Sequence, residues 1–182
     1  ETTLLCGFLG CDARPYNPLL TSLPRVLHLP GGAGGWLSVF PAQVVRESRS
    51  AGPGGDSMLT RMAELMFVEV VRSYLQTLGE EQVGWLAALR DPVVGNALSR
   101  MHERPAHDWT LQELAREVAA SRSVLAERFT HLIGIPPMQY LANWRWQLAA
   151  EHLMRDGVKG AAVGRQVGYD SEAAFSRAFK RA

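Results

Sequence analysis

One pattern occurs twice in the C-terminal half of this 182-residue chain. Residues 111–129 read LQELAREVAASRSVLAERF, and residues 160–179 read GAAVGRQVGYDSEAAFSRAF. Each stretch predicts a short amphipathic helix, a tight turn, a serine that caps the next helix, and a second short helix with an aromatic residue on its buried side. Two such units, about 50 residues apart and joined by one long helix, are typical of a duplicated helix-turn-helix.

A helix-turn-helix has a geometry that suits DNA. Its first helix braces the second, and the second is narrow enough to enter the major groove with its N-terminal residues against the base edges. A single pair of this kind also occurs in all-α proteins that bind no DNA. The duplication therefore favours a DNA-binding protein over an all-α protein-interaction module, which stays as an alternative.

The remaining elements are predicted from hydrophobic periodicity, caps and breakers. Two short apolar runs, residues 2–10 and 25–29, predict strands at the end of a larger β domain whose beginning is missing. Helices are predicted near residues 19–23, 41–49, 56–78, 85–89, 92–103, 111–119, 122–132 and 137–154. The chain begins with Glu and its last residues predict an uncapped helix, so we expect an internal piece of a longer protein.

Composition and charge narrow the class of protein. Hydrophobic residues make up 47% of the chain and charged residues 20%, which excludes wholesale disorder. No run of about 20 apolar residues lacks a Pro or Gly break, so we expect no membrane span. Residues 90–182 hold 13 basic and 10 acidic residues, against 6 and 8 in residues 1–89. This asymmetry points weakly to an anion-binding C-terminal half.

Residues 91–182 resemble the DNA-binding domain of AraC/XylS-type bacterial transcription regulators. The resemblance rests on WTLQELAREVAASRSVLAERFTHLIGIPPMQYLANWRWQLAAEHL and on VGYDSEAAFSRAFKR. Upstream, CGFLGCD, NPLLTSLPRVLHL and AELMFVEVVRSYL resemble the end of the cupin-like ligand-binding domain of one subgroup. The implied fold class is α+β overall, with a cupin-like β remnant followed by a mostly α region that carries two helix-turn-helix units.

The resemblance also implies domain boundaries and partners. Residues 1–50 would be the end of the sensor domain, 51–90 connector and dimerisation helices, and 91–182 the DNA-binding domain without its last helix. The implied partners are double-stranded promoter DNA, RNA polymerase, a second copy of the chain and an unknown small-molecule or redox effector, with no membrane. The helix 56–78 is the candidate dimer contact, and packing within the chain is the alternative. The implied location is cytoplasmic, at the nucleoid through DNA.

The family's base-reading positions fall early in each recognition helix. In the first unit these are Arg122, Ser123, Val124 and Glu127, and in the second unit Glu172, Ala173, Ser176 and Arg177. Arginine and serine donate hydrogen bonds to base or phosphate oxygens, and glutamate accepts from cytosine N4. Arg177 is the foremost candidate for a base or phosphate contact. Arg145, on the long helix between the units, is expected to reach a phosphate or to tie the two units together.

A second candidate site lies near the N-terminus, where Cys6, Cys11 and His28 supply soft or borderline metal ligands. Their spacing matches no standard zinc pattern, and buried structural cysteines are the commoner outcome. An alternative function is therefore a cupin-like metal- or thiol-dependent sensor or enzyme with an incidental helical domain. No nucleophile lies beside a histidine in a catalytic pattern, so we expect no enzyme activity and no cofactor.

Overall fold

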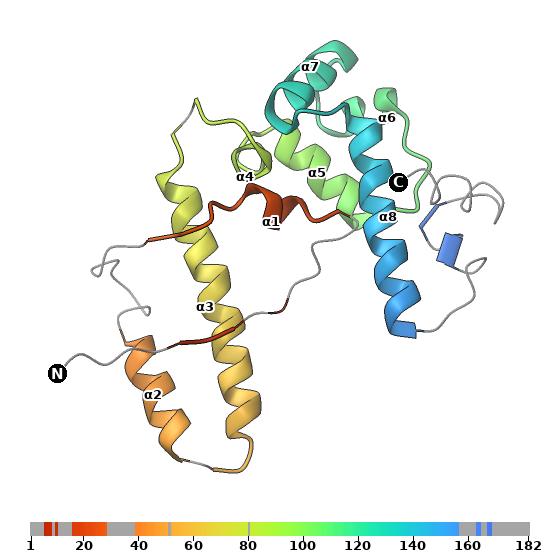
Figure 1. Ribbon diagram of the computed structural model, residues 1–182. Coiled ribbons are helices and arrows are strands. Elements are labelled where there is room, and N and C mark those ends of the chain that lie inside the picture. Colours follow the sequence, from red (N-terminus) through yellow and green to blue (C-terminus); the bar gives the residue numbers. More distant parts are fainter. Residues whose placement is uncertain are drawn as a thin grey trace. The chain divides into compact units, whose positions relative to one another are not determined.

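The computed structural model of the chain describes residues 6–8, 10, 16–28, 39–50, 52–79, 81–156, 163–164 and 167–168 (Figure 1). These residues form eight helices, α1 to α8, in two compact units. The first unit holds residues 1–11 and 23–79, and the second unit holds residues 12–22 and 80–182. Residues 12–22 thus belong to the second unit although the chain on both sides of them belongs to the first.

The expected α+β fold class is wrong for the residues that the structure describes, because none of them lies in a strand. Residues 6–8, 10 and 25–28, from the two predicted strands, are irregular. Phe8 is 97% exposed and Val26 79% exposed, and neither range makes a backbone hydrogen bond to another described residue. An apolar run becomes a strand only when its N–H and C=O groups pair with a neighbouring strand. The apolar sequence of these runs does not by itself provide a neighbouring strand with which their backbone groups could pair.

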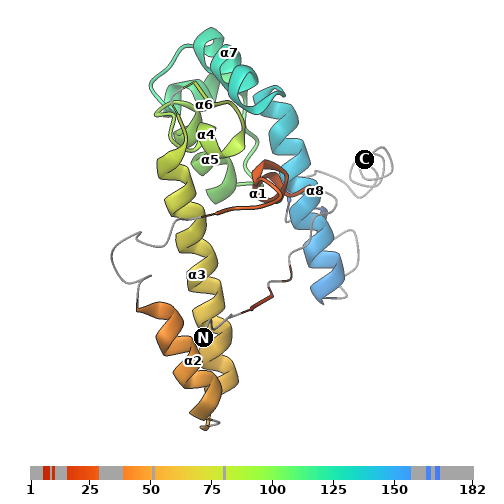
Figure 2. The ribbon, with the colours of Figure 1, turned by 60° about the vertical axis from the view of Figure 1, so that its left-hand side comes forward.

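The first unit contains a helical hairpin of α2, Phe40–Ser50, and α3, Gly55–Thr77. Figures 1 and 2 both show α2 lying along the N-terminal part of α3. The break between them depends on Gly54, whose φ of 81° is a left-handed conformation that glycine adopts without steric cost. Phe40 and Met62 are buried in this hairpin.

The second unit is built from short helices around one core. They are α1 (Pro18–Ser22), α4 (Trp85–Ala88), α5 (Val94–Glu103), α6 (Leu111–Glu117), α7 (Arg122–Ile133) and α8 (Pro137–Asp156). Every helix predicted in the described ranges is present, with its ends within two residues of those predicted. The core includes Val94, Leu98, Met101, Leu114, Leu125, Phe129 and Tyr140, all essentially without exposed surface.

An aromatic cluster lies at the centre of this core. The Tyr140 hydroxyl accepts a hydrogen bond from Trp85 Nε1 at 2.7 Å and lies 2.9 Å from His102 Nε2. The His102 ring stacks on Trp144 with 4.2 Å between centroids. Burial lowers the pKa of His102 to about 4, so its imidazole is neutral at pH 7. A neutral Nε2 can accept a hydrogen bond from the Tyr140 hydroxyl. The cluster therefore joins α4, α5 and α8 through one satisfied polar chain.

Candidate nucleic-acid interface

The first helix-turn-helix is formed by α6, the turn 118–120 and α7. The Thr110 side chain caps α6 by accepting from the Glu113 N–H at 3.1 Å, and Ser121 caps α7 by accepting from the Val124 N–H at 3.2 Å. A hydrogen bond from His107 lowers the pKa of Glu113, and the Thr110 N–H lowers it by a smaller amount. Together these contributions outweigh desolvation, which would raise the pKa. Thr110 is thus the N-cap of α6.

The turn between α6 and α7 has a left-handed residue that the sequence does not predict, because no glycine occupies this position. Ala119 has a φ of 53°, in the left-handed region that is costly for a residue with a Cβ. The Ala120 N–H donates to the Ala115 carbonyl at 2.9 Å, and the Ala119 N–H donates to the Arg116 carbonyl at 3.2 Å. This is the Schellman pattern, usually built on glycine. It ends α6 sharply and sets the angle at which α7 departs.

The helix α7 has one buried and one exposed side. Leu125 and Phe129 are completely buried against α6 and α8. The four candidate residues of this helix, Arg122, Ser123, Val124 and Glu127, are all exposed. Val124 is 43% exposed, a large fraction for a valine in a folded unit. The structure therefore brings the four candidates together on the outer side of the first turns of α7.

Charge pairing distinguishes the candidates from their neighbour Arg128. Neither Arg122 nor Glu127 forms an ion pair with any residue that the structure describes. Arg128 instead pairs with Asp91, at the start of α5. Arg122 and Glu127 are thus available to an external partner, whereas the Arg128 guanidinium already has a carboxylate.

Asp91 was not predicted as a functional residue from the sequence, yet its carboxylate connects the start of α5 to Arg128 of α7. Its Oδ1 accepts from the Val93 and Val94 N–H groups at 2.9 and 2.8 Å, and its Oδ2 accepts from Arg128. Burial opposes ionisation of this carboxyl, but the Val94 N–H, Arg128 and the Val93 N–H together lower its pKa. An Asp-Pro pair at the start of a helix was the available signal, because it is typical of an N-cap followed by Pro at N1. The partner on α7 carried no signal in the sequence.

Arg145 lies in the middle of α8 with its guanidinium already engaged. Its Nε donates to the Pro105 carbonyl and its terminal nitrogen to the His107 carbonyl, each at 2.7 Å. Gly168, with a φ of 88°, lies against the same loop: a Cβ there would come within 2.8 Å of the Ala106 carbonyl oxygen and 3.1 Å of Arg145 Cζ. Arg145 thus connects α8 to the loop 104–108. Gly168, in the second repeat, contacts the same loop.

The second repeat is described only in part. Val163 and Val167 are buried with Ala149 of α8, and Leu148 and Leu153 pack beside them. The remaining four candidate residues lie outside the described part of the chain: Glu172, Ala173, Ser176 and Arg177. Of this repeat, the structure thus shows Val163 and Val167 packed with Ala149 of α8, and the predicted base readers of the repeat stay a prediction.

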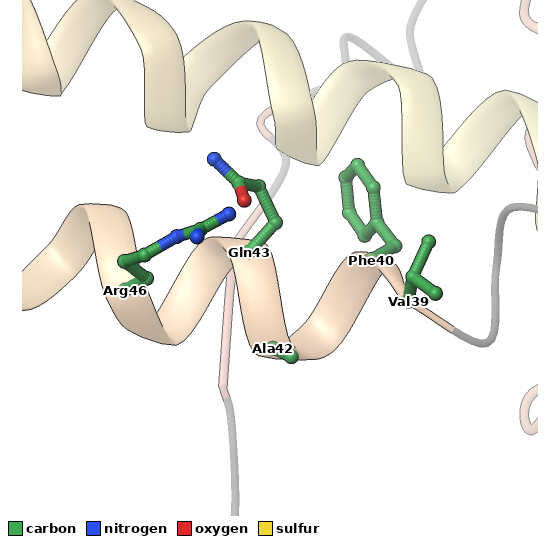
Figure 3. A pocket seen from close by; sticks show the side chains of 5 residues that line it. All are labelled: Val39, Phe40, Ala42, Gln43 and Arg46. Atoms are coloured by element: carbon green, nitrogen blue, oxygen red, sulfur yellow. The ribbon is translucent and has the colours of Figure 1, made fainter.

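The structure does not bring the candidate metal ligands near the N-terminus together among the residues that it describes. Cys6 and His28 are exposed, and Cys11 is not among the described residues. No three His, Cys, Asp or Glu side chains within the described ranges come together as a metal site. A hollow beside α2 is lined by Val39, Phe40, Ala42, Gln43 and Arg46. Figure 3 shows Phe40 and Gln43 directed from α2 towards the neighbouring helix. No described helix is long and apolar enough to cross a membrane.

Comparison with known proteins gives two family matches. Residues 1–76 match the family described as Cupin, and residues 114–182 match the family described as Helix-turn-helix domain. The second match begins within α6, includes the turn and α7, which presents the exposed candidates, and continues through the second repeat. The first match includes α1, α2 and all but the last residue of α3.

Curated relatives match over nearly the whole chain. A protein of Streptomyces antibioticus described as an AraC-like transcription regulator is 39% identical over 183 residues, covering 100% of this chain and 60% of its own length. The HTH-type transcriptional regulator AlkR of Acinetobacter baylyi is 34% identical, covering 93% of this chain and 56% of its own. The RCS-specific HTH-type transcriptional activator RclR of Escherichia coli is 32% identical, covering 100% of this chain and 64% of its own.

The chain therefore spans about 60% of the length of the relatives it matches. Its two matched regions stand in the order cupin and then helix-turn-helix, and the named relatives are transcription regulators. With a cupin-family region in front of a helix-turn-helix region, the chain belongs to the AraC family, whose matched members are named transcription regulators.

Proposed function

We propose that this protein is a sequence-specific transcription regulator that reads promoter DNA with two recognition helices. The observation that carries the proposal is the exposed face of α7 formed by Arg122, Ser123, Val124 and Glu127, whose two charged side chains form no ion pair with a described residue. A capped and braced helix that exposes a cation and a carboxylate at its N-terminal turns has the groups that major-groove readout requires.

Each side chain of this face has a role in the proposed complex. Arg122 donates to a guanine edge or a phosphate, and Glu127 accepts from a cytosine amino group. Ser123 donates to a base or phosphate oxygen, and Val124 packs on a thymine methyl group. Arg128 is excluded from this set because Asp91 holds its guanidinium. In the second repeat, Glu172, Ala173, Ser176 and Arg177 read the adjacent major-groove segment, about one helical turn or 34 Å away.

The proposed organisation has three parts. Residues 1–50 close the sensor domain, residues 51–90 connect it to the rest and form the homodimer contact, and residues 91–182 bind DNA. The dimer contact is placed on α3 because this helix exposes three large apolar side chains, Met58, Leu65 and Val68. A change of effector state then alters dimer geometry, promoter affinity and recruitment of RNA polymerase in the cytoplasm. The relatives named above are regulators, and we propose a regulatory rather than catalytic role for this chain too.

The decisive experiment is selection of bound sequences from random duplex DNA with the 182-residue chain. We expect a two-box motif, with enrichment at one box lost in Arg122→Ala and at the other in Arg177→Ala. Each base contact is worth about 1–3 kcal/mol, so specific affinity should fall roughly 5- to 150-fold. Arg46→Ala is the matched control, because Arg46 is an exposed arginine of α2, outside both helix-turn-helix units and the proposed dimer contact. Absence of any motif above nonspecific binding would overturn the proposal in favour of a protein-interaction module.

A salt titration then separates base contacts from phosphate contacts. If Arg122 reads a base, its replacement lowers affinity for the selected duplex but leaves the slope of log affinity against log salt unchanged. If it binds a phosphate, the slope falls by about 0.9, the value for one phosphate on duplex DNA. The dimer contact has its own test in sedimentation equilibrium. Leu65→Glu should shift the population towards monomer, whereas Thr60→Glu, an exposed polar position on the same helix, should not.

A further inference from the structure

Seven residues of the cupin-matched sequence, Tyr16–Ser22, lie in the helical second unit rather than in the first. We call these residues the clasp. The chain leaves the first unit after residue 11, contributes residues 12–22 to the second unit, and returns to the first unit at residue 23. Figures 1 and 2 show the helix of the clasp, α1, near α4 and α8. The cupin match, residues 1–76, covers the clasp and the flanking chain on both sides.

The clasp is attached to α8 by a hydrogen bond to a buried side chain. The Tyr16 N–H donates to Gln147 Oε1 at 2.9 Å. Gln147 is only 2% exposed, and its Nε2 donates to Glu151 Oε1 at 2.9 Å. The clasp therefore supplies a partner for an amide oxygen that is shielded from water. A buried acceptor left without a donor is unfavourable, so undocking of the clasp affects α8 directly.

The aromatic ring of Tyr16 makes a second contact with the same helix. It meets the Tyr140 ring edge-on, with 5.8 Å between centroids and an interplanar angle of 83°. Burial raises the pKa of Tyr16 to about 12, consistent with a hydroxyl withdrawn from solvent. The clasp also holds its own shape, because Asn17 Oδ1 accepts from the Leu20 N–H at 3.1 Å and Pro18 is buried.

The two contact points on α8 lie between the two helix-turn-helix units. Tyr140 belongs to the core around the first helix-turn-helix, where its ring meets Phe129 of α7 with 5.6 Å between centroids. Beyond Gln147, Ala149 packs with Val163 of the second repeat. Because α8 connects both recognition elements, its position decides how far apart and at what angle they can approach DNA.

We infer that the clasp couples the state of the cupin-family region to α8, and through α8 to the spacing of the two DNA-reading units. The chain runs back into the first unit on both sides of the clasp, so a rearrangement there changes the tension on both of its ends. Its effect on DNA rests on the proposed function, whereas docking of the clasp does not. Coupling of this kind is reciprocal: DNA that favours one position of α8 also favours one state of the first unit.

The docking is tested by amide hydrogen exchange on the full chain without DNA. Tyr16→Ala removes the ring contact with Tyr140 but keeps the backbone N–H, whereas Gln147→Leu removes the acceptor of that N–H. Each should speed exchange of the Tyr16–Ser22 amides by about tenfold, the size of one aromatic pair or one net hydrogen bond. The two effects should be non-additive in the double variant, because both remove the same docking. Thr21→Ala is the control: among the described residues, its hydroxyl donates to the carbonyls of Asn17 and Pro18 within the clasp. Additive effects, or equal exchange in all variants, would overturn the docked clasp.

The coupling is tested by disturbing the first unit and observing the second. Phe40→Ala removes a buried side chain of α2, and Arg46→Ala removes an exposed one from the same helix. We expect Phe40→Ala, but not Arg46→Ala, to speed exchange in the clasp and to change affinity for the selected duplex. The affinity change should disappear when Tyr16→Ala is also present. Met62→Ala, at another buried position of the first unit, repeats the test.

Two results separate this inference from the proposed function. If clasp exchange is the same in Phe40→Ala, Met62→Ala and Arg46→Ala, the clasp is a passive strap and the coupling is wrong. If no duplex is ever selected, the DNA-binding proposal fails, while the exchange measurements still decide whether the first unit is coupled to α8.

Discussion

Acidification from pH 7 to pH 5 should destabilise the second unit through His102. The rings that lie against this imidazole belong to Trp85, Tyr140 and Trp144, and none of them carries a negative charge at these pH values. The Tyr140 hydroxyl, which accepts from Trp85, is satisfied by a neutral Nε2 acceptor. A protonated imidazole would turn that acceptor into a second donor in a buried place.

The size of the effect follows from the difference in pKa between the two states. Burial lowers the pKa of His102 to about 4 in the folded chain, from 6.5 for an unperturbed histidine. Because the folded pKa is the lower one, the unfolded chain binds more protons between pH 6.5 and 4. Stability is therefore complete above pH 6.5 and is lost as the pH falls towards 4. At 1.36 kcal/mol per unit, the free energy of unfolding should fall by about 2 kcal/mol between pH 7 and pH 5.

The assay is urea unfolding at pH 7, 6 and 5, followed by tryptophan fluorescence, to which Trp85 and Trp144 contribute beside the imidazole. His102→Gln removes the titrating group, so this variant should lose much less free energy of unfolding over the same range. His131→Gln, at an exposed position of α7, should behave like the parent chain. An equal loss in His102→Gln and in the parent would refute the reasoning, because the slope would then belong to other groups.

Three further outcomes are expected from the DNA-reading unit. Ala119→Gly should stabilise the chain by about 0.5–1 kcal/mol, because it relieves a left-handed alanine, whereas Ala120→Gly should destabilise it by a similar amount; chemical denaturation measures both. Phe129→Ala should cost roughly 3–5 kcal/mol of unfolding free energy and abolish DNA binding, and retention of the parent's denaturation midpoint would contradict the observed core. Asp91→Asn can still cap α5 but weakens the hold on Arg128, so the salt dependence of nonspecific DNA binding should steepen by up to about 0.9; an unchanged slope would show that Arg128 stays away from phosphate.

Local patterns were sufficient for the helices and for the first reading unit. The ends of α6 and α7 depend on Thr110, Ser121 and Gly134, whose capping chemistry involves only residues three or four positions away. The inward positions of Leu125 and Phe129 likewise follow from helical spacing. The outward positions of Arg122 and Glu127 are the complement of that spacing, whereas their role as base readers comes from the family resemblance and stays a prediction.

The predicted strands fail for the opposite reason, since their pairing is not local. The exposed Phe8 and Val26 show that an apolar run of suitable length has no strand structure of its own. The preference for DNA over other partners also came from the sequence, through the doubling of a pattern that a single copy would have left ambiguous. The predicted base readers of the second repeat rest on the family resemblance alone.

Sequence by itself determined the helical segments, their N-caps, the duplicated helix-turn-helix pattern and the buried face of α7, because each depends on neighbours within about one turn of helix. Only the tertiary structure decided which distant groups meet. It pairs Asp91 with Arg128, occupies Arg145 with the carbonyls of Pro105 and His107, and joins the Tyr16 N–H to Gln147, 131 positions away. Such contacts depend on how helices pack against one another, and a side chain's spacing along its own helix carries no information about the partner that packing brings to it.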